Sequence, residues 1–246
     1  MAESDEQYDA LGKEYERVKY IPTGLCERAT FLSALPDLTG KSVLDVACGT
    51  GFYPRQFVSL GAERVVGVDS SQEMVSYAQY VEKRDQQGIV YAQYDAVTLP
   101  LLGSFDVVTA VWLLGYAEGE AALDAMVGNL VANVAPGGTL AVLFPNPDAD
   151  FDLLEDYQKY GYYMSRGEPS LGRQGVVVHV LGESEFSFDS FFWPPGVVDL
   201  ALSRAGLTNV TRHPTVVPED AVASYGEEFW AQLRVSPSFA VLTATR

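Results

Sequence analysis

Residues 43–53 read Val-Leu-Asp-Val-Ala-Cys-Gly-Thr-Gly-Phe-Tyr, in which an apolar run leads into a turn with two glycines. The apolar run predicts a buried strand, and Gly49 and Gly51 allow unusual backbone angles and close approach of a ligand. A helix that starts after such a turn offers unpaired N–H groups to that ligand. The stretch therefore predicts a strand, a turn and a helix that hold a nucleotide-like ligand. The alternative is a tight turn that serves packing alone.

Strand-like and helix-like patterns alternate along most of the chain. The predicted strands lie at 43–46, 65–68, 89–94, 105–111, 139–144, 207–212 and 239–245, and helical patterns lie between them at 56–60, 74–81 and 121–134. Such alternation is typical of a parallel sheet with helices on its faces. We therefore predict an α/β fold with a doubly wound, mostly parallel sheet of seven strands.

The length of 246 residues fits one domain, 1–246, in which the pattern defines four parts. The parts are an N-terminal helical lid at 1–39, the ligand-binding core at 40–145, an insertion at 146–192, and a C-terminal helix with the last strands at 193–246. Clustered aromatic side chains set the insertion apart, and we expect it to cover the substrate. Further helices are predicted at 8–19, at 25–35, and after Pro194 or Pro195.

The charge and hydropathy of the chain limit its partners. It carries 33 acidic and 16 basic side chains, a formal net charge of −17. Proteins that bind nucleic acid neutralise phosphates with clustered Lys and Arg, so we expect no nucleic acid partner. The sequence shows no secretory signal and no run of about 18 apolar residues that could span a bilayer. We expect a cytoplasmic protein with no membrane partner.

The chain has two cysteines, Cys26 and Cys48. They are too few for a disulfide framework and lack the spacing of a zinc site. We expect reduced thiols and no metal. The composition leaves the oligomeric state open.

The glycine turn and a later carboxylate narrow the choice of ligand. Dinucleotide sites use G-x-G-x-x-G, but here Gly49 and Gly51 are followed by Pro54, which disfavours NAD and FAD. Asp69 ends the second predicted strand, 18 positions after Gly51, where a carboxylate can accept hydrogen bonds from both hydroxyls of a ribose. Capping of the next helix is the alternative role for Asp69, although a following serine could be the cap instead.

Residues 45–51 resemble the motif of class I S-adenosylmethionine (SAM)-dependent methyltransferases, and the resemblance extends over 40–144. It implies a Rossmann-like fold, SAM as cofactor, S-adenosylhomocysteine (SAH) as product and no metal. The glycine turn would contact the methionine part of SAM, and Asp95 the adenine amino group. The implied cofactor-binding residues are Tyr15, Asp45, Ala47, Cys48, Gly49, Gly51, Asp69, Ser70, Met74, Asp95, Ala96 and Trp112. For Met74 and Trp112, plain core packing is the alternative.

Residues 8–15, 51–55 and 67–70 together resemble a narrower family, the small-molecule methyltransferases related to toxoflavin synthase. This resemblance implies methylation of a small, planar heteroaromatic acceptor in secondary metabolism, with N-methylation first and O- or C-methylation as alternatives. It also implies an N-terminal helix that folds over the cofactor and places Tyr8 near the transferred methyl, with Tyr15 as second candidate. Both tyrosines could instead be lid or core aromatics.

The acceptor site is the least defined part of the prediction. The expected acceptor-binding residues are Tyr8, Tyr116, Tyr157, Tyr160, His179 and Trp193. His179 is also the candidate base, and a hydrogen-bonded strand histidine is the alternative. Two other function classes remain at this stage: a nucleotide-dependent oxidoreductase of the same fold, and a binding subunit without activity.

Overall fold

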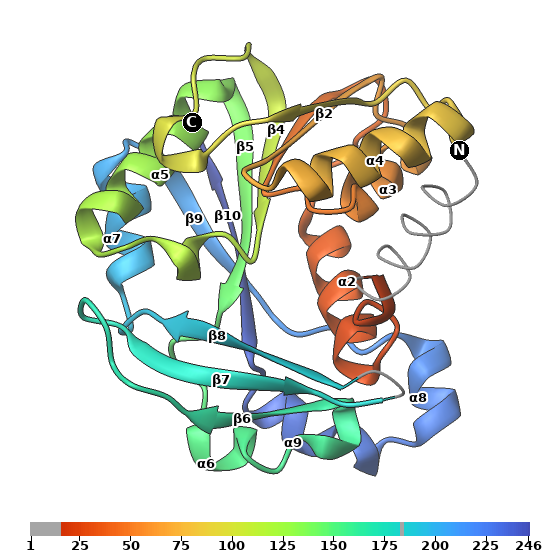
Figure 1. Ribbon diagram of the computed structural model, residues 1–246, viewed down its shortest axis with the longest axis vertical. Coiled ribbons are helices and arrows are strands. Elements are labelled where there is room, and N and C mark those ends of the chain that lie inside the picture. Colours follow the sequence, from red (N-terminus) through yellow and green to blue (C-terminus); the bar gives the residue numbers. More distant parts are fainter. Residues whose placement is uncertain (1–15, 183–184) are drawn as a thin grey trace.

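The computed structural model describes residues 16–182 and 185–246 (Figure 1). The described residues form a seven-stranded sheet with strand order β3-β2-β1-β4-β5-β10-β9. Its strands are β1 (Ser42–Val46), β2 (Arg64–Asp69), β3 (Val90–Gln93), β4 (Phe105–Val111), β5 (Val134–Pro145), β9 (Thr208–His213) and β10 (Phe239–Thr245). The predicted doubly wound, seven-stranded architecture is confirmed.

The pairing in this sheet is parallel from β3 to β5, and β10 runs antiparallel to both of its neighbours. The chain moves from β1 through β2 to β3 on one side, then returns to β4 on the other side of β1. Connections on the two sides leave a crevice beyond the carboxyl ends of β1 and β4. The topology therefore fixes where a ligand can bind.

Helices cover both faces of the large sheet, as Figure 1 shows. One face packs against α2 (Pro22–Ala34), α3 (Phe52–Ser59) and α4 (Gln72–Asp85), and the other against α5 (Glu120–Asn133) and α7 (Val197–Arg204). Each helix supplies an apolar stripe: Phe31 and Phe57 are fully buried on the first face, and Leu130 and Leu202 on the second. Burial on both faces fixes the positions of the strands, and so of their carboxyl ends.

Several helix starts differ from the prediction, and for two of them the local residues give the reason. The first described helix starts at Pro22 instead of 25, because proline fits the first helical position, where its missing N–H costs nothing. The helix after the insertion starts at Val197 instead of at Pro194 or Pro195, because Gly196 adopts a left-handed conformation, with φ of 83°, directly before it. The part of the predicted helix 8–19 that precedes residue 16 lies outside the described residues.

The insertion forms a second sheet. Its strands β6 (Tyr162–Arg166), β7 (Gln174–Val180) and β8 (Phe186–Phe192) pair antiparallel in that order, after α6 (Phe151–Leu154) and η3 (Gln158–Tyr160). Of these elements, the sequence pattern indicates only β7, through the strand-like run from Val176 to Leu181. Between β9 and β10 the chain forms α8 (Glu219–Tyr225), η4 (Glu228–Trp230) and α9 (Ala231–Val235), which were not predicted. The four-part division of a single domain stays a prediction.

The turn after β1 yields a first prediction. Gly51 has φ of 81°, and a Cβ there would lie 2.4 Å from the hydroxyl oxygen of Tyr91. We expect Gly51→Ala to lower the free energy of unfolding by about 1–3 kcal/mol, since strain and overpacking add. Gly128→Ala is the matched control, because nothing lies within 4 Å of its Cβ inside α5, and it should stabilise by about 0.5–1 kcal/mol. Urea unfolding of both variants measures this; equal effects would contradict it.

Candidate functional site

A cavity of about 1050 Å³, here called the sheet-edge cavity, lies at the carboxyl ends of β1, β2 and β4. Its walls are the turn after β1, the end of β2, the segment after β3 and the segment after β4. Of the residues predicted to bind a cofactor, it brings together Ala47, Cys48, Gly49, Asp69, Ser70, Met74, Asp95, Ala96 and Trp112. The crevice expected from the topology is therefore present.

The turn after β1 is shaped by left-handed backbone conformations. Ala47 and Gly49 have φ of 66° and 53°. A Cβ added at Gly49 would have nothing within 4 Å. The backbone of Gly49 thus faces open space in a cavity, where a ligand can approach it closely.

Asp69 joins this turn to β2 and to the next helix. Its carboxylate accepts hydrogen bonds from the N–H of Gly49, at 2.8 Å, and from the N–H of Ser71, at 2.9 Å. The Ser71 side chain, at the N-cap of α4, accepts from the N–H of Met74. Asp69 is therefore not the helix cap, and each of its oxygens keeps a lone pair for a ligand hydroxyl.

Asp95 follows β3 and also lines the sheet-edge cavity. It is the N-cap of the short helix η1 (Ala96–Thr98), where its Oδ1 accepts from the N–H of Val97 at 2.7 Å. Its other oxygen has acceptor capacity to spare for a ligand amino group. Asp69 and Asp95 thus place carboxylates at two positions along one cavity.

A second cavity of about 530 Å³, here called the apolar cavity, adjoins the first. Val18, Lys19, Trp112 and Tyr116 line both cavities. Trp112 holds its place at this junction by an unusual φ of 61° and by a hydrogen bond from its N–H to the Leu143 carbonyl. The junction is where groups bound in the two cavities would meet.

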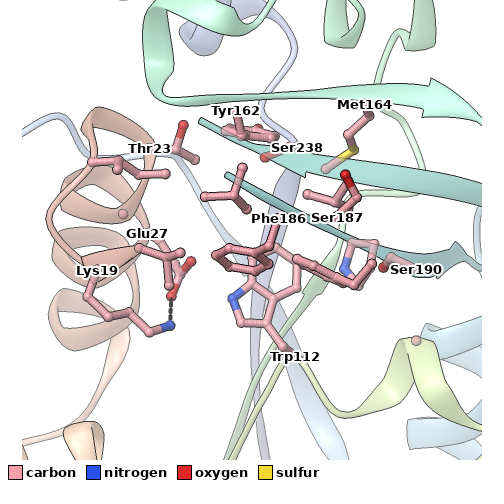
Figure 2. A pocket seen from close by; sticks show the side chains of 18 of the residues that line it. Lys19, Thr23, Glu27, Trp112, Tyr162, Met164, Phe186, Ser187, Ser190 and Ser238 are labelled. Atoms are coloured by element: carbon pink, nitrogen blue, oxygen red, sulfur yellow. Dashed lines mark hydrogen bonds and ion pairs between the residues drawn. The ribbon is translucent and has the colours of Figure 1, made fainter. Parts of the chain in front are cut away.

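The apolar cavity lies between α2 and the inner face of the small sheet (Figure 2). Its lining residues include Ile21, Pro145, Tyr162, Met164, Val178, Val180, Phe186, Phe188 and Phe192. Its polar members are Lys19, Thr23, Glu27, Ser187, Ser190 and Ser238. A cavity of mainly aromatic and aliphatic side chains with few polar groups suits a small organic ligand.

Glu27 is a functional candidate that the sequence prediction missed. Its Oε1 accepts from Lys19 Nζ at 2.6 Å, drawn in Figure 2, and from the Tyr53 hydroxyl at 2.9 Å. The side chain of Glu27 is only 8% exposed. Burial raises the pKa of Tyr53, and the Glu27 charge raises it further, so Tyr53 stays a hydrogen-bond donor. The sequence feature that could have identified Glu27 is a polar stripe on a buried helix face, formed by Thr23, Glu27 and Thr30.

Two residues with implied cofactor contacts lie behind the cavity wall. Gly51 is the N-cap of α3, and the Asp45 side chain is buried beneath the turn, where it accepts from Thr109 Oγ1 at 2.6 Å. Neither is among the residues that line the sheet-edge cavity. Tyr8 and Tyr15 lie outside the described residues.

Several predicted acceptor-binding residues do not reach either cavity. Tyr157 and Tyr160 are fully buried, and their hydroxyls donate to the backbone carbonyls of Ser236 and Phe229. The Trp193 indole N–H donates to the Leu114 carbonyl at 2.7 Å. Packing and internal hydrogen bonds thus account for these three side chains. Tyr116 does line both cavities, at the end of η2 (Leu114–Tyr116).

His179 lies on the outer face of the small sheet. Val178 and Val180 line the apolar cavity, so alternation along β7 turns His179 away from it. Its ring nitrogens lie 2.9 Å from the hydroxyls of Ser165 and Ser187. The structure therefore shows the hydrogen-bonded strand histidine that was the alternative, and His179 itself does not line the apolar cavity, although its partner Ser187 does.

Comparisons with known proteins agree with this geometry. A family model described as a methyltransferase domain matches residues 43–138. Ribosomal protein L11 methyltransferase of Xanthomonas axonopodis pv. citri is 34% identical over 139 residues, which are 55% of this chain and 42% of that protein. Demethylmenaquinone methyltransferase of Lactococcus lactis subsp. lactis is 33% identical over 111 residues, 42% of this chain and 44% of that protein. The chain thus spans less than half the length of these curated relatives.

A solved structure shows the same fold. It is an S-adenosylmethionine dependent methyltransferase from Mesorhizobium loti, similar with a TM-score of 0.65 at 19% identity, over 90% of this chain and 98% of that chain. Residues 43–138 thus match a methyltransferase domain, and the described residues have the fold of class I, SAM-dependent methyltransferases. The narrower resemblance to relatives of toxoflavin synthase stays a prediction.

Two further findings concern the residues that the structure describes. None of their helices is long and apolar enough to cross a bilayer. Within the same ranges, no three or more His, Cys, Asp or Glu side chains gather in an arrangement that could hold a metal ion.

The buried carboxyl of Asp45 yields a pH prediction. Burial raises its pKa from 3.8 to about 7, although the hydrogen bond from Thr109 opposes the rise. The folded state therefore keeps this proton longer than the unfolded state, and the resulting stabilisation is complete below pH 4 and lost as the pH rises to 7. Asp45→Asn removes this dependence. Its free energy of unfolding, relative to the original protein, should increase from pH 4 to 7 and then level off. A pH-independent difference in urea unfolding would contradict the assignment.

Proposed function

We propose that this protein transfers the methyl group of SAM to a small, planar heteroaromatic metabolite, with a ring nitrogen as the methylated atom. Oxygen or carbon is the alternative methylated atom. The observation that carries the proposal is the pair of adjoining cavities, one with the carboxylates and glycine turn suited to SAM, the other apolar and of small-molecule size. We place this activity in the cytoplasm and in secondary metabolism.

The residues of the sheet-edge cavity fit SAM. The open backbone at Gly49 leaves room for the methionine part, where a side chain would intrude. The Asp69 carboxylate can accept from the two ribose hydroxyls, since its own backbone contacts leave lone pairs free. Asp95 can accept from the adenine amino group, with Met74 beside the ring. The missing third glycine is consistent with a ligand that has no pyrophosphate.

The relatives leave more than one acceptor class open, because one is named for ribosomal protein L11 and another for demethylmenaquinone. The apolar cavity supports a small molecule here. It is enclosed by the small sheet and α2, and its walls are aromatic and aliphatic. A flat ring system buries well against such walls. A negative net charge of −17 further disfavours nucleic acid.

In the proposed mechanism, bound SAM would supply an electrophilic methyl group for direct transfer to the acceptor atom, with SAH as the leaving group. The chain contributes alignment: the two cavities meet at Trp112 and Tyr116, so both partners are held in line and away from water. Tyr8, which lies outside the described residues, is proposed to close over this junction.

Glu27 is proposed to accept the proton that the acceptor N–H loses. Its carboxylate lies in the wall of the apolar cavity, held by Lys19 and Tyr53, which both line the sheet-edge cavity. It can accept the hydrogen of an acceptor N–H and take that proton as the new bond to carbon forms. The outward position of His179 favours Glu27 over His179 for this role.

Cofactor binding is tested by calorimetry with SAM, SAH and NADH on the purified protein. We expect SAM and SAH to bind and NADH not to bind. Asp69→Ala should weaken SAH binding about 10- to 100-fold, the scale of lost hydrogen bonds to a charged group. Asp124→Ala is the matched control, because that carboxylate pairs with Arg204 on the surface. Unchanged SAH affinity in Asp69→Ala, or tight NADH binding, would overturn this assignment.

The proton role is tested by Glu27→Gln. Screening heteroaromatic N–H compounds with SAM by mass spectrometry supplies an acceptor. We then expect kcat to fall about 10²- to 10⁴-fold, while the SAH dissociation constant changes less than threefold. Lys19→Met is the control for loss of the ion pair, since it keeps the carboxylate. If Glu27→Gln and Lys19→Met reduce kcat equally, Glu27 serves the ion pair only.

A further inference from the structure

The guanidinium of Arg173 is a buried charge without a carboxylate partner. Arg173 is 4% exposed, and no Asp or Glu of the described residues forms an ion pair with it. Its Nε donates to the Ser170 carbonyl at 3.3 Å, and its Nη1 to the Gly115 carbonyl at 2.9 Å. Burying a charge costs free energy, and apolar side chains of similar volume often stabilise a core as well. Stability alone therefore gives little reason for an arginine at this position.

Aromatic rings fix the orientation of this guanidinium. It lies 4.1 Å from the centroid of the Phe191 ring and 5.7 Å from that of the Trp193 ring. Because a guanidinium is a rigid planar fork, its packing against rings also fixes the direction of its N–H groups. The hydrogen bond from Arg173 to the Gly115 carbonyl is thus held in one geometry.

The carbonyl that Arg173 binds belongs to η2, the short helix after β4. The carbonyl one position earlier, that of Leu114, accepts from the indole N–H of Trp193. Both donors flank the small sheet, since Arg173 directly precedes β7 and Trp193 directly follows β8. The contact is tight: a Cβ at Gly115 would lie 2.9 Å from the Phe191 carbonyl oxygen. Two side chains therefore fasten η2 to the small sheet.

The last residue of η2 is Tyr116, which lies at the junction of the two cavities. Its side chain is half-exposed, and its hydroxyl has no hydrogen-bond partner among the described residues. The backbone of η2 therefore sets the position of the Tyr116 ring. Arg173 itself lines neither cavity, so any effect it has on bound groups must pass through η2.

We propose that Arg173 is a positioning residue for methyl transfer. By holding the Gly115 carbonyl, it fixes the Tyr116 ring at the junction, and with it the alignment of a group in the apolar cavity with the methyl group of SAM. This inference rests on the proposed function, because it takes the apolar cavity as the acceptor site. Transfer rates are sensitive to small displacements of aligned groups, so kcat should depend on this contact.

The test compares Arg173→Met with Arg166→Met in the full chain. Arg166 is the matched control: it ends β6 and also lies over a phenylalanine ring, that of Phe151, but it is exposed and pairs with Asp152. Fluorine NMR of protein that contains 3-fluorotyrosine, without added ligand, reports on Tyr116 through the resonance that Tyr116→Phe removes. We expect Arg173→Met to shift or broaden this resonance, and Arg166→Met to leave it unchanged.

Kinetics separate positioning from folding. The acceptor is a compound that the mass-spectrometry screen shows to be methylated, and the temperature is one at which every variant is folded. We expect Arg173→Met to lower kcat about tenfold or more, with the SAH dissociation constant changed less than about threefold. Arg173→Lys should restore part of kcat, since its ammonium can still donate to the Gly115 carbonyl. In a Tyr116→Ala background, Arg173→Met should lower kcat less than about twofold, because the two residues act as one unit.

The outcomes are distinct. An unchanged Tyr116 resonance in Arg173→Met overturns the inference, and this result requires no acceptor. So does a kcat equal to that of Arg166→Met, or an equal loss of kcat with and without the Tyr116 ring. If Arg173→Met does not fold, Arg173→Lys takes its place in the same measurements, with smaller effects of the same direction expected. Failure of SAH to bind, or of any screened compound to be methylated, would instead overturn the proposed function.

Discussion

The hydrogen bond from the Gly49 N–H to the Asp69 carboxylate is the contact on which the binding site depends. It ties the turn after β1 to the end of β2, which are adjacent parallel strands. The same carboxylate accepts from the N–H of Ser71, the N-cap of α4. One side chain thus fixes a turn, a strand end and a helix start. These neighbours hold the left-handed backbone at Ala47 and Gly49 in place.

The large sheet was predictable from the sequence because most of its strands, the antiparallel β10 included, are local apolar runs. The bounds of β1, β4 and β10 match the prediction within one residue, or coincide with it. The antiparallel small sheet and the helices between β9 and β10 were largely missed. They are aromatic-rich or short amphipathic segments, and their burial depends on residues far away in the sequence. The ring of Trp230, for example, stacks on that of Tyr160 with 6.0 Å between the ring centroids. Local periodicity carries no signal for such contacts.

The two cavities likewise differ in how well the sequence predicts their residues. The residues of the sheet-edge cavity follow directly from strand ends, so a motif finds them. The apolar cavity, the proposed acceptor side, is assembled from α2, β5 and the small sheet. A tyrosine-rich segment gives no indication of which tyrosine faces into this cavity. Tyr160 ends in the core and Tyr162 in the cavity wall, two positions apart. Glu27 was equally hidden, because only the fold shows that it lines the apolar cavity.

The ion pair of Glu27 with Lys19 has an electrostatic consequence for the proposed reaction. An isolated carboxylate would be costly in an apolar cavity, and Lys19 offsets that cost. Before transfer, the sulfonium and Lys19 are positive and Glu27 is negative, a net charge of +1. After transfer, the sulfur is neutral, Glu27 holds the proton of the acceptor, and Lys19 remains positive, again +1. The net charge of the site therefore stays constant during the step, and no ion has to enter or leave the apolar surroundings. The barrier then includes no cost of desolvating an additional charge, a cost that a carboxylate outside the cavity would not remove.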